Sequence, residues 1–361
     1  MNPHNETHRP VERKLVALFL VVTELTIYSS AFAQSSVTLS GLIDVEINSQ
    51  VLESNGQRVT NLNGAPNGPN SGLQNSYFQI AGDESVAEGI STGYTLCSYF
   101  QPSTGELGRF VGDTIFSCSA NLHVTSDFGT LTIGVQESPL YQAMVLFDPF
   151  NGSFGYSPII QQTYYAFAAG NVLSTDTGYS NAISYSLSAI NGLSANLLYS
   201  LSGENHADGS FSGNIIANQE RLSVSFAIEG STVTGPSNNT FILGGKYPIG
   251  TIQKVWLGGT SYDFDPVKAF LSYQREVTTI PGVVAVVRST AQLGAAATIN
   301  HSQLLASFAQ TTGPIGHRTW SIGYARNLSK VTEVYVAYLH DSARSFVRPI
   351  CSAGIGVVYR F

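Results

Sequence analysis

The stretch VTLSGLIDVEIN, residues 37–48, alternates between apolar and polar side chains. Successive side chains of a β-strand point to opposite faces, so this period of two predicts a strand with one apolar and one polar face. The polar face would carry Thr38, Ser40, Asp44, Glu46 and Asn48. Such a strand separates an apolar environment from an aqueous one.

The same alternation recurs through the chain and is also found at its C-terminal end. At the C-terminus, one face is shared by Ala353, Ile355, Val357, Tyr359 and Phe361. The intervening segments are roughly ten residues long, the length of a tilted strand that crosses a membrane. Examples are residues 181–188, 194–202, 221–229, 255–264, 267–276, 303–310, 319–327 and 331–340.

The connections between these segments fall into two sizes. Short turns rich in Gly, Asn, Asp or Pro occupy residues 189–192, 263–266 and 327–330. Longer connections occupy residues 51–72, 101–113, 138–178 and 203–219. This asymmetry is typical of outer-membrane barrels, with short periplasmic turns and long outer loops, and the count is about sixteen antiparallel strands. Within residues 230–258, the part 231–239 is either a periplasmic turn or a short strand.

The composition favours a barrel over other classes of protein. Of 361 residues, 11% are charged and 43% are hydrophobic, and 35 are Gly, whereas ordinary soluble domains carry about 25% charged residues. The formal charge of −7 argues against nucleic-acid binding, which usually needs a basic patch. A soluble β-sandwich also alternates, but it would not explain an uncharged polar face with aromatic residues near the strand ends.

The first 33 residues predict a secretory signal peptide. Arg9, Arg13 and Lys14 form a basic region, residues 15–22 are apolar, and Ala31-Phe32-Ala33 resembles a cleavage site. The apolar run is shorter than the roughly 20 residues of a spanning helix. The alternative is an amphipathic N-terminal helix of a cytosolic protein. We expect cleavage near Ala33 and a mature domain of residues 34–361.

The order of the motifs resembles one known family. The opening QSSVTLSGLID (residues 34–44), the turn Gly82-Asp83-Glu84 and the segment TSDFGTLTIG (residues 125–134) are similar to the general porins of β-proteobacteria and the neisserial-type porins. The resemblance covers nearly all of the mature chain. It implies an all-β, sixteen-stranded transmembrane barrel, usually a homotrimer, through which small hydrophilic solutes and ions diffuse passively across the Gram-negative outer membrane. Outer-membrane lipids would surround it.

The resemblance also assigns roles to particular segments. The family folds its third outer loop inward as a constriction, and residues 138–178 take that place, with Asp148, Phe150 and Asn151 in the candidate constriction segment. The alternative is a mobile surface loop. The terminal Phe361 with Tyr359 two places before it resembles the signal read by the outer-membrane assembly machinery.

One departure from the family concerns the wall opposite that loop. Tyr77, Ala81, Cys118 and Val135 stand where the family usually has arginine. Asp44 and Glu46 remain on the polar face of the first strand, so these two residues and Tyr77 are predicted to line the pore. The hypothesis is a weakly cation-preferring or neutral channel. A barrel with a blocked lumen that acts as a receptor, adhesin or structural protein is the alternative.

The cysteines leave two readings open, and no catalytic centre is predicted. Cys97 and Cys118 flank an outer loop and could pair in the oxidising periplasm, but strand parity turns Cys118 outward and Cys97 inward, which favours free thiols. The His residues of the predicted mature chain are scattered, and zinc, phosphate-binding and nucleophile motifs are lacking. We therefore expect no enzymatic activity, cofactor or metal; a barrel hydrolase has no specific support.

Overall fold

A computed structural model describes residues 36–52, 57–62, 72–109, 113–164, 177–201, 209–232, 248–313, 316–342 and 349–361. The predicted signal peptide and its cleavage site lie outside these residues and stay predictions. None of the helices in the described ranges is long and apolar enough to cross a membrane.

The described chain is almost entirely antiparallel strand. The first nine strands are β1 (Ser36–Leu52), β2 (Arg58–Leu62), β3 (Tyr77–Ala87), β4 (Ile90–Tyr99), β5 (Ser119–Ser126), β6 (Gly129–Glu137), β7 (Gly178–Ile190), β8 (Leu193–Ser200) and β9 (Ser210–Gln219). The others are β10 (Leu222–Thr232), β11 (Ile252–Asp263), β12 (Val267–Thr279), β13 (Val286–Ile299), β14 (Ser302–Thr312), β15 (Arg318–Asn327), β16 (Thr332–Asp341) and β17 (Pro349–Arg360). Two helices, α2 (Pro139–Leu146) and α3 (Pro158–Tyr164), follow β6.

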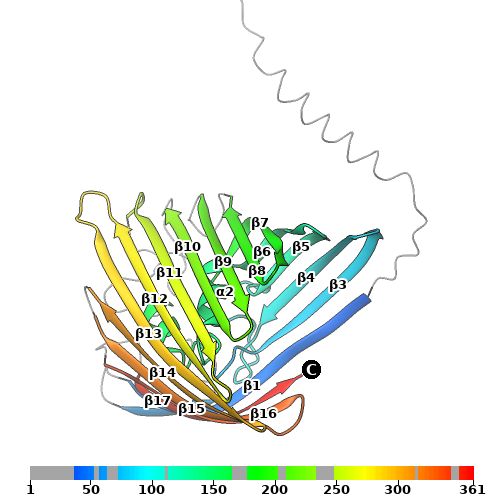
Figure 1. Cartoon of the computed structure of the whole chain (residues 1–361). Helices are drawn as coiled ribbons and strands as arrows, with labels where there is room; N and C mark the ends of the chain where they lie inside the picture. The colour runs from blue at the N-terminus through cyan, green and yellow to red at the C-terminus, as the bar shows by residue number, and fades with distance from the viewer. Residues whose placement is uncertain are drawn as a thin grey trace, which may run out of the picture.

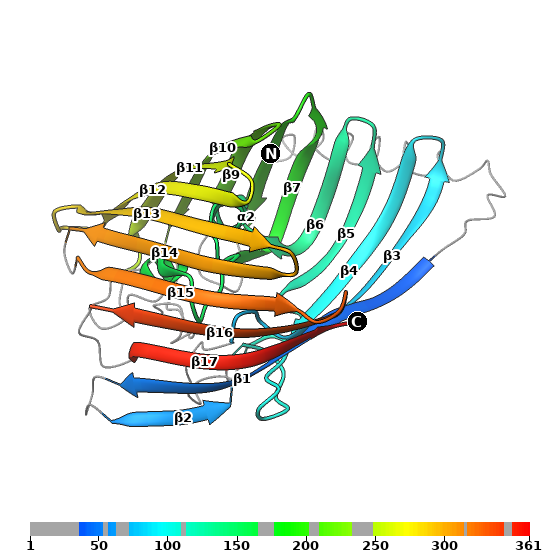
Figure 2. The same cartoon turned by 60° about the horizontal axis from the view of Figure 1, so that its bottom comes forward.

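The sheet closes on itself because the long strand β1 has partners on both sides. One edge of β1 pairs with β17, from Leu42↔Arg360 to Leu52↔Pro349. The other edge pairs first with β3 and then with the short β2, which together fill one place in the wall. The 17 labelled strands therefore form a closed wall of 16 places (Figures 1 and 2), which confirms the expected barrel.

The two faces of the wall have opposite chemistry, as the alternation predicts. On β1, Val37 and Leu39 point outward and are 68% and 62% exposed, whereas Asp44 and Glu46 point inward and are 0% and 1% exposed. Exposed Leu, Ile, Val and aromatic side chains recur on the outward positions of the other strands. An apolar exterior around a polar interior suits a barrel surrounded by lipid, because lipid offers no hydrogen-bond partners.

Most connections follow the prediction, with two errors. The predicted loop 51–72 is wrong in its middle, because Arg58–Leu62 forms β2 on the edge of β1. Residues 191–192, 264–266 and 328–331 are short turns, and Asn191 and Gly192 have positive φ angles of 52° and 79°. The predicted loop 203–219 is wrong in its second half, because Ser210–Gln219 is β9. Its alternation is interrupted by Gly213 and Ile216, which hid the strand. Residues 231 and 232 end β10; the rest of 231–239 lies outside the described residues.

Candidate functional site

Residues 138–164, called the inner segment below, leave the wall after β6 and run through the interior of the barrel (Figure 1). Ser138 begins α2, since its side chain accepts a hydrogen bond from the Tyr141 N–H at 3.1 Å. Helix α2 packs on β8–β11, and α3 packs on β13–β15. The inner segment therefore covers one side of the interior and leaves the wall from β3 to β7 uncovered by α2 and α3.

Helix α2 is held mainly by apolar contacts. Leu140, Ala143 and Met144 share a buried cluster with Val255 and Leu257 of β11. Beyond the helix, Phe147 lies over Gly259 of β11, where an added Cβ would come within 2.6 Å of its ring. Fully burying a large apolar side chain contributes about 1.5–3 kcal/mol, so this contact fixes α2 against the wall.

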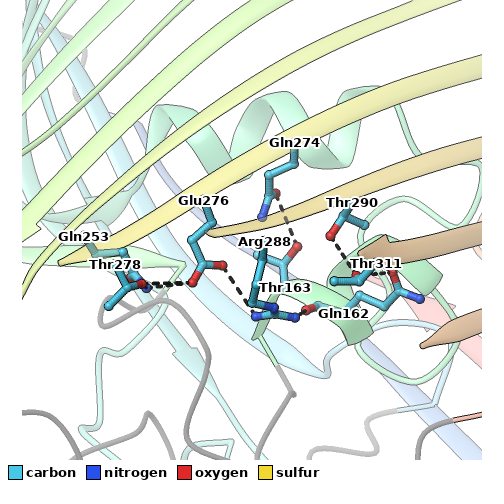
Figure 3. A network of polar contacts seen from close by, with 9 residues as sticks. All are labelled: Gln162, Thr163, Gln253, Gln274, Glu276, Thr278, Arg288, Thr290 and Thr311. Carbon is cyan, nitrogen blue, oxygen red and sulfur yellow. Dashed lines mark hydrogen bonds and ion pairs between the residues drawn. The ribbon is translucent and has the colours of Figure 1, made fainter. Parts of the chain in front are cut away.

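Helix α3 is held by a buried polar network (Figure 3). The Gln162 amide donates to the carbonyl of Ala309 at 2.9 Å and to the hydroxyl of Thr319 at 3.0 Å, and its oxygen accepts from Thr311 at 2.7 Å. The Arg288 guanidinium donates to the Gln162 carbonyl at 3.0 Å and lies 3.5 Å from the Glu276 carboxylate. Buried polar groups require such partners, so the network selects one position for α3.

The two carboxylates predicted to line the pore accept hydrogen bonds from the inner segment and its surroundings. The Tyr335 hydroxyl lies 2.7 Å from Asp44 and 3.0 Å from Glu46, and the Tyr156 hydroxyl donates to Glu46 at 2.9 Å. The Gln74 N–H donates to Asp44 at 2.7 Å. Both carboxylates are therefore enclosed by protein donors rather than by channel water.

The other residues predicted to line the pore are partly buried and partly exposed. Asp148 and Phe150 are 1% and 2% exposed, whereas Asn151 is exposed and Tyr77 is partly exposed. A pore-lining role stays a prediction for all six candidates; Tyr77 and Asn151 are the two that solvent reaches in this structure. At the C-terminus, Phe361 pairs its backbone with Gly41, and Tyr359 points outward.

The uncovered wall carries polar side chains that remain partly exposed. On β3–β6, Gln79, Thr95, Asn121, Thr132 and Gln136 belong to this set. On the inner segment, the exposed side chains are Gln142, Leu146 and Asn151. Water therefore reaches these inward groups while the groups behind the inner segment are sealed. The interior thus has one wet side and one packed side.

Close to the short-turn end of the wet side, His123 of β5 and Asp83 of β3 meet across β4. The His123 Nε2 lies 3.0 Å from the Asp83 carboxylate. Gly93 of β4 lies between them, and a Cβ there would come within 2.4 Å of Asp83 and 2.5 Å of His123. The missing side chain is what allows the contact. His123 is thus an inward polar residue, as its alternation indicates.

Glu137 is a charge at the junction of β6 and the inner segment that the sequence reasoning missed. It is exposed at the end of β6, next to the start of α2, and it influences the buried Tyr141 electrostatically. Among the described residues no ion pair to Glu137 is formed, whereas Arg109 pairs with Asp113 at 3.0 Å and Arg288 with Glu276. Tyr77, Ala81 and Val135 contribute no charge. Its position directly before a proposed constriction segment is the signal that could have identified it.

The favoured reading of the cysteines is wrong, because Cys97 and Cys118 form a disulfide with Cα atoms 5.1 Å apart. Cys118 lies one residue before β5, so the inward-outward parity of that strand does not apply to it. Cys351 is a free, partly exposed cysteine. No group of three potential metal ligands occurs in the described ranges.

Removing this disulfide is expected to loosen the outer loop more than the barrel. The bridge closes a sequence separation of 21 residues, which is worth about 3 kcal/mol in the chain-entropy model. A Cys97→Ser/Cys118→Ser variant should be cleaved faster by protease within residues 98–117 while it keeps the heat-modifiable folded form in unheated gels. Cys351→Ser is the matched control and should be cleaved like the wild type; equal cleavage of all three proteins would contradict this expectation.

Asp148 makes the anchoring of the inner segment depend on pH. Burial raises the pKa of its carboxyl to about 6, despite the hydrogen bond from the Gly152 N–H. The folded state therefore binds this proton more tightly than the unfolded state, and stability falls as pH rises from about 4 to about 6. At pH 4 we expect the unfolding temperature of Asp148→Asn to equal that of the wild type. At pH 7 we expect it to be higher than that of the wild type. A constant difference between the two would contradict this assignment.

Three solved structures illustrate what the barrel is similar to. An anion-selective porin from Comamonas acidovorans has a TM-score of 0.74 at 18% identity, covering 91% of this chain and 100% of its own. OmpT of Vibrio cholerae in a trimer form has a TM-score of 0.65 at 12% identity, and the match covers 91% of this chain and 99% of that one. OmpF of Salmonella typhi has a TM-score of 0.62 at 14% identity, and the match covers 90% of this chain and 97% of that one. The family description "Gram-negative porin" matches residues 17–345, and no curated protein matches.

Proposed function

Because this chain belongs to the Gram-negative porin family, whose members are outer-membrane diffusion channels, we propose that ions and small hydrophilic solutes cross it between the inner segment and the wall β3–β7. The packing of the inner segment on one side of the interior supports this route. Burial of its anchoring side chains keeps that side closed, and the partly exposed polar residues opposite keep the other side hydrated. Solute passage then depends on the width and charge of the remaining space.

The same channel is proposed to prefer cations weakly. Arg109 is paired with the carboxylate of Asp113, and Arg288 with that of Glu276. Exposed Glu137 has no such ion pair among the described residues, and it lies at the end of β6, directly before the inner segment. An uncompensated carboxylate attracts cations and repels anions over about a Debye length. This preference is opposite to the one stated for the Comamonas porin.

Assembly and targeting complete the proposal. The trimeric form of the Vibrio OmpT supports a homotrimer. Cleavage near Ala33 would release a mature chain of residues 34–361, and Tyr359 and Phe361 would be read by the assembly machinery of the outer membrane. Both aromatic side chains are exposed in the barrel, at 48% and 47%.

Planar-bilayer recordings of the protein purified from outer membranes test this function. We expect conductance steps in groups of three. Under a KCl gradient, the sign of the reversal potential should show that K⁺ is more permeant than Cl⁻. A reversal potential of the opposite sign would overturn the ion preference. A folded barrel that inserts without conductance would overturn the open channel and favour the receptor alternative.

A further inference from the structure

A groove of about 300 Å³ lies on the outward surface, at the end of the barrel that carries the short turns. Residues of the β13–β14 hairpin and of β15 form it, and Figure 2 shows these strands side by side. The residues that line it are Ala297, Ile299, Asn300, His301, Ser302, Leu304, Tyr324 and Arg326. None of these residues is acidic.

The strand registers place this lining on the lipid-facing side. Ile299 pairs with Ser302, and Ser302 pairs with Arg326. Leu304 pairs with Tyr324 on the same face. Ile299, Leu304 and Tyr324 are 55%, 53% and 37% exposed, whereas Leu305 and Ala325, which point inward, are 7% and 5% exposed. The groove is thus open to the surroundings of the barrel and not to its interior.

Its depth corresponds to the level of lipid headgroups. Short turns mark the periplasmic end of an outer-membrane barrel, and aromatic side chains gather at both lipid–water boundaries. At this end Phe128, Phe264 and Tyr359 are exposed by 79%, 60% and 48%. Tyr324 stands among these residues at the groove, so Arg326, two residues nearer the turn, lies at the boundary where lipid phosphates lie.

The polar side of the groove is rich in hydrogen-bond donors. The Ser302 and Tyr324 hydroxyls are 3.0 Å apart, and the Arg326 side chain also interacts with the Tyr324 hydroxyl. The His301 imidazole lies in the turn beside them. Arginine binds phosphate oxygens in a bidentate manner. The other side is apolar, with Ala297, Ile299 and Leu304.

We propose that this groove binds one glycerophospholipid of the periplasmic leaflet. The Arg326 guanidinium and the neighbouring hydroxyls would donate hydrogen bonds to the phosphate, and an acyl chain would lie against Ile299 and Leu304. Charge complementarity carries the assignment, because a cation on an outward position of a spanning strand is costly unless it reaches water or an anion. The proposal does not depend on whether the lumen conducts.

Native mass spectrometry of the full barrel in mild detergent tests this site. The protein is titrated separately with phosphatidylglycerol, with a diacylglycerol of the same acyl chains, and with glycerol phosphate. We expect a specific adduct with phosphatidylglycerol alone. Arg326→Gln should weaken it about tenfold, as expected for the loss of hydrogen bonds from a charged group, and Arg326→Lys should weaken it less. Arg318→Gln is the matched control, because Arg318 is exposed on the other end of the same strand.

Each alternative has its own result. Equal binding of diacylglycerol would show an apolar groove without phosphate recognition, and equal binding of glycerol phosphate would show a site for soluble anions; either overturns the proposal. Equal weakening in Arg318→Gln and Arg326→Gln would also overturn it, because the effect would then follow net charge. Folding of every variant is checked by its migration in unheated gels.

Discussion

An Arg288→Met variant is expected to release α3 from the wall and to give a noisier channel with larger open-state conductance. The substitution removes the cation from a side chain only 3% exposed and leaves the Glu276 carboxylate, 4% exposed, with hydrogen bonds but without its charge partner (Figure 3). Breaking a buried ion pair in this way costs about 3–5 kcal/mol. The lost hydrogen bond from Arg288 to the Gln162 carbonyl removes a direct contact with α3.

Two further variants make this result specific. Arg288→Met/Glu276→Gln removes both charges and should recover part of the wild-type conductance pattern, because no buried charge is left unpaired although the hydrogen bond to the Gln162 carbonyl is still missing. Arg275→Met changes an exposed, outward arginine of β12 and should behave like the wild type. Single-channel noise and the temperature at which the folded gel form disappears are the measurements. Wild-type behaviour of Arg288→Met would show that the network does not hold the inner segment.

A Glu137→Gln variant is expected to lower the ratio of cation to anion permeability by about two- to fivefold at 0.1 M salt. Two unit charges about 4 Å apart in water interact by about 1 kcal/mol, which is about a fivefold change in local ion occupancy. Glu137→Lys should shift the reversal potential further, towards anion preference. Reversal potentials under a KCl gradient measure both effects.

Salt and position provide the controls for this prediction. At 1 M salt the Debye length falls to about 3 Å, so the difference between Glu137→Gln and the wild type should shrink. Glu106→Gln changes an exposed carboxylate of the outer loop 100–118 and should leave the ratio unchanged. If the two glutamine variants have equal ratios, or if neither differs from the wild type, Glu137 does not set the ion preference.

The barrel itself could be predicted from the sequence because its signals are local and repeated. A strand in lipid must alternate between the two faces, and the run from Val37 to Asn48 shows this in consecutive residues. Turn residues such as Asn191 and Gly192 act through their own φ angles. The strand β9 escaped because Gly213 and Ile216 weaken the alternation, although pairing with β8 and β10 still forms it.

The site could be predicted only in part, since alternation tells which way a side chain points but not what covers it. Asp44 and Glu46 do point inward. What encloses them comes from positions far along the chain: Tyr335 is 291 residues from Asp44, and Tyr156 is 110 residues from Glu46. Glu137 and Asp44 are both acidic residues within strands, and only the tertiary structure distinguishes the exposed one from the buried one.

The sequence by itself thus determined the strands of the wall and its outward apolar face, because both depend on neighbouring residues or on short, repeated patterns. The place of the inner segment was expected only from the resemblance to the porins. The tertiary structure alone decided the Cys97–Cys118 bond, the anchors of α3 and the division of the interior into a wet and a packed side. The physical reason is that burial and ion pairing depend on contacts between distant segments, and the free energy of a charge changes by several kcal/mol when such a contact replaces water.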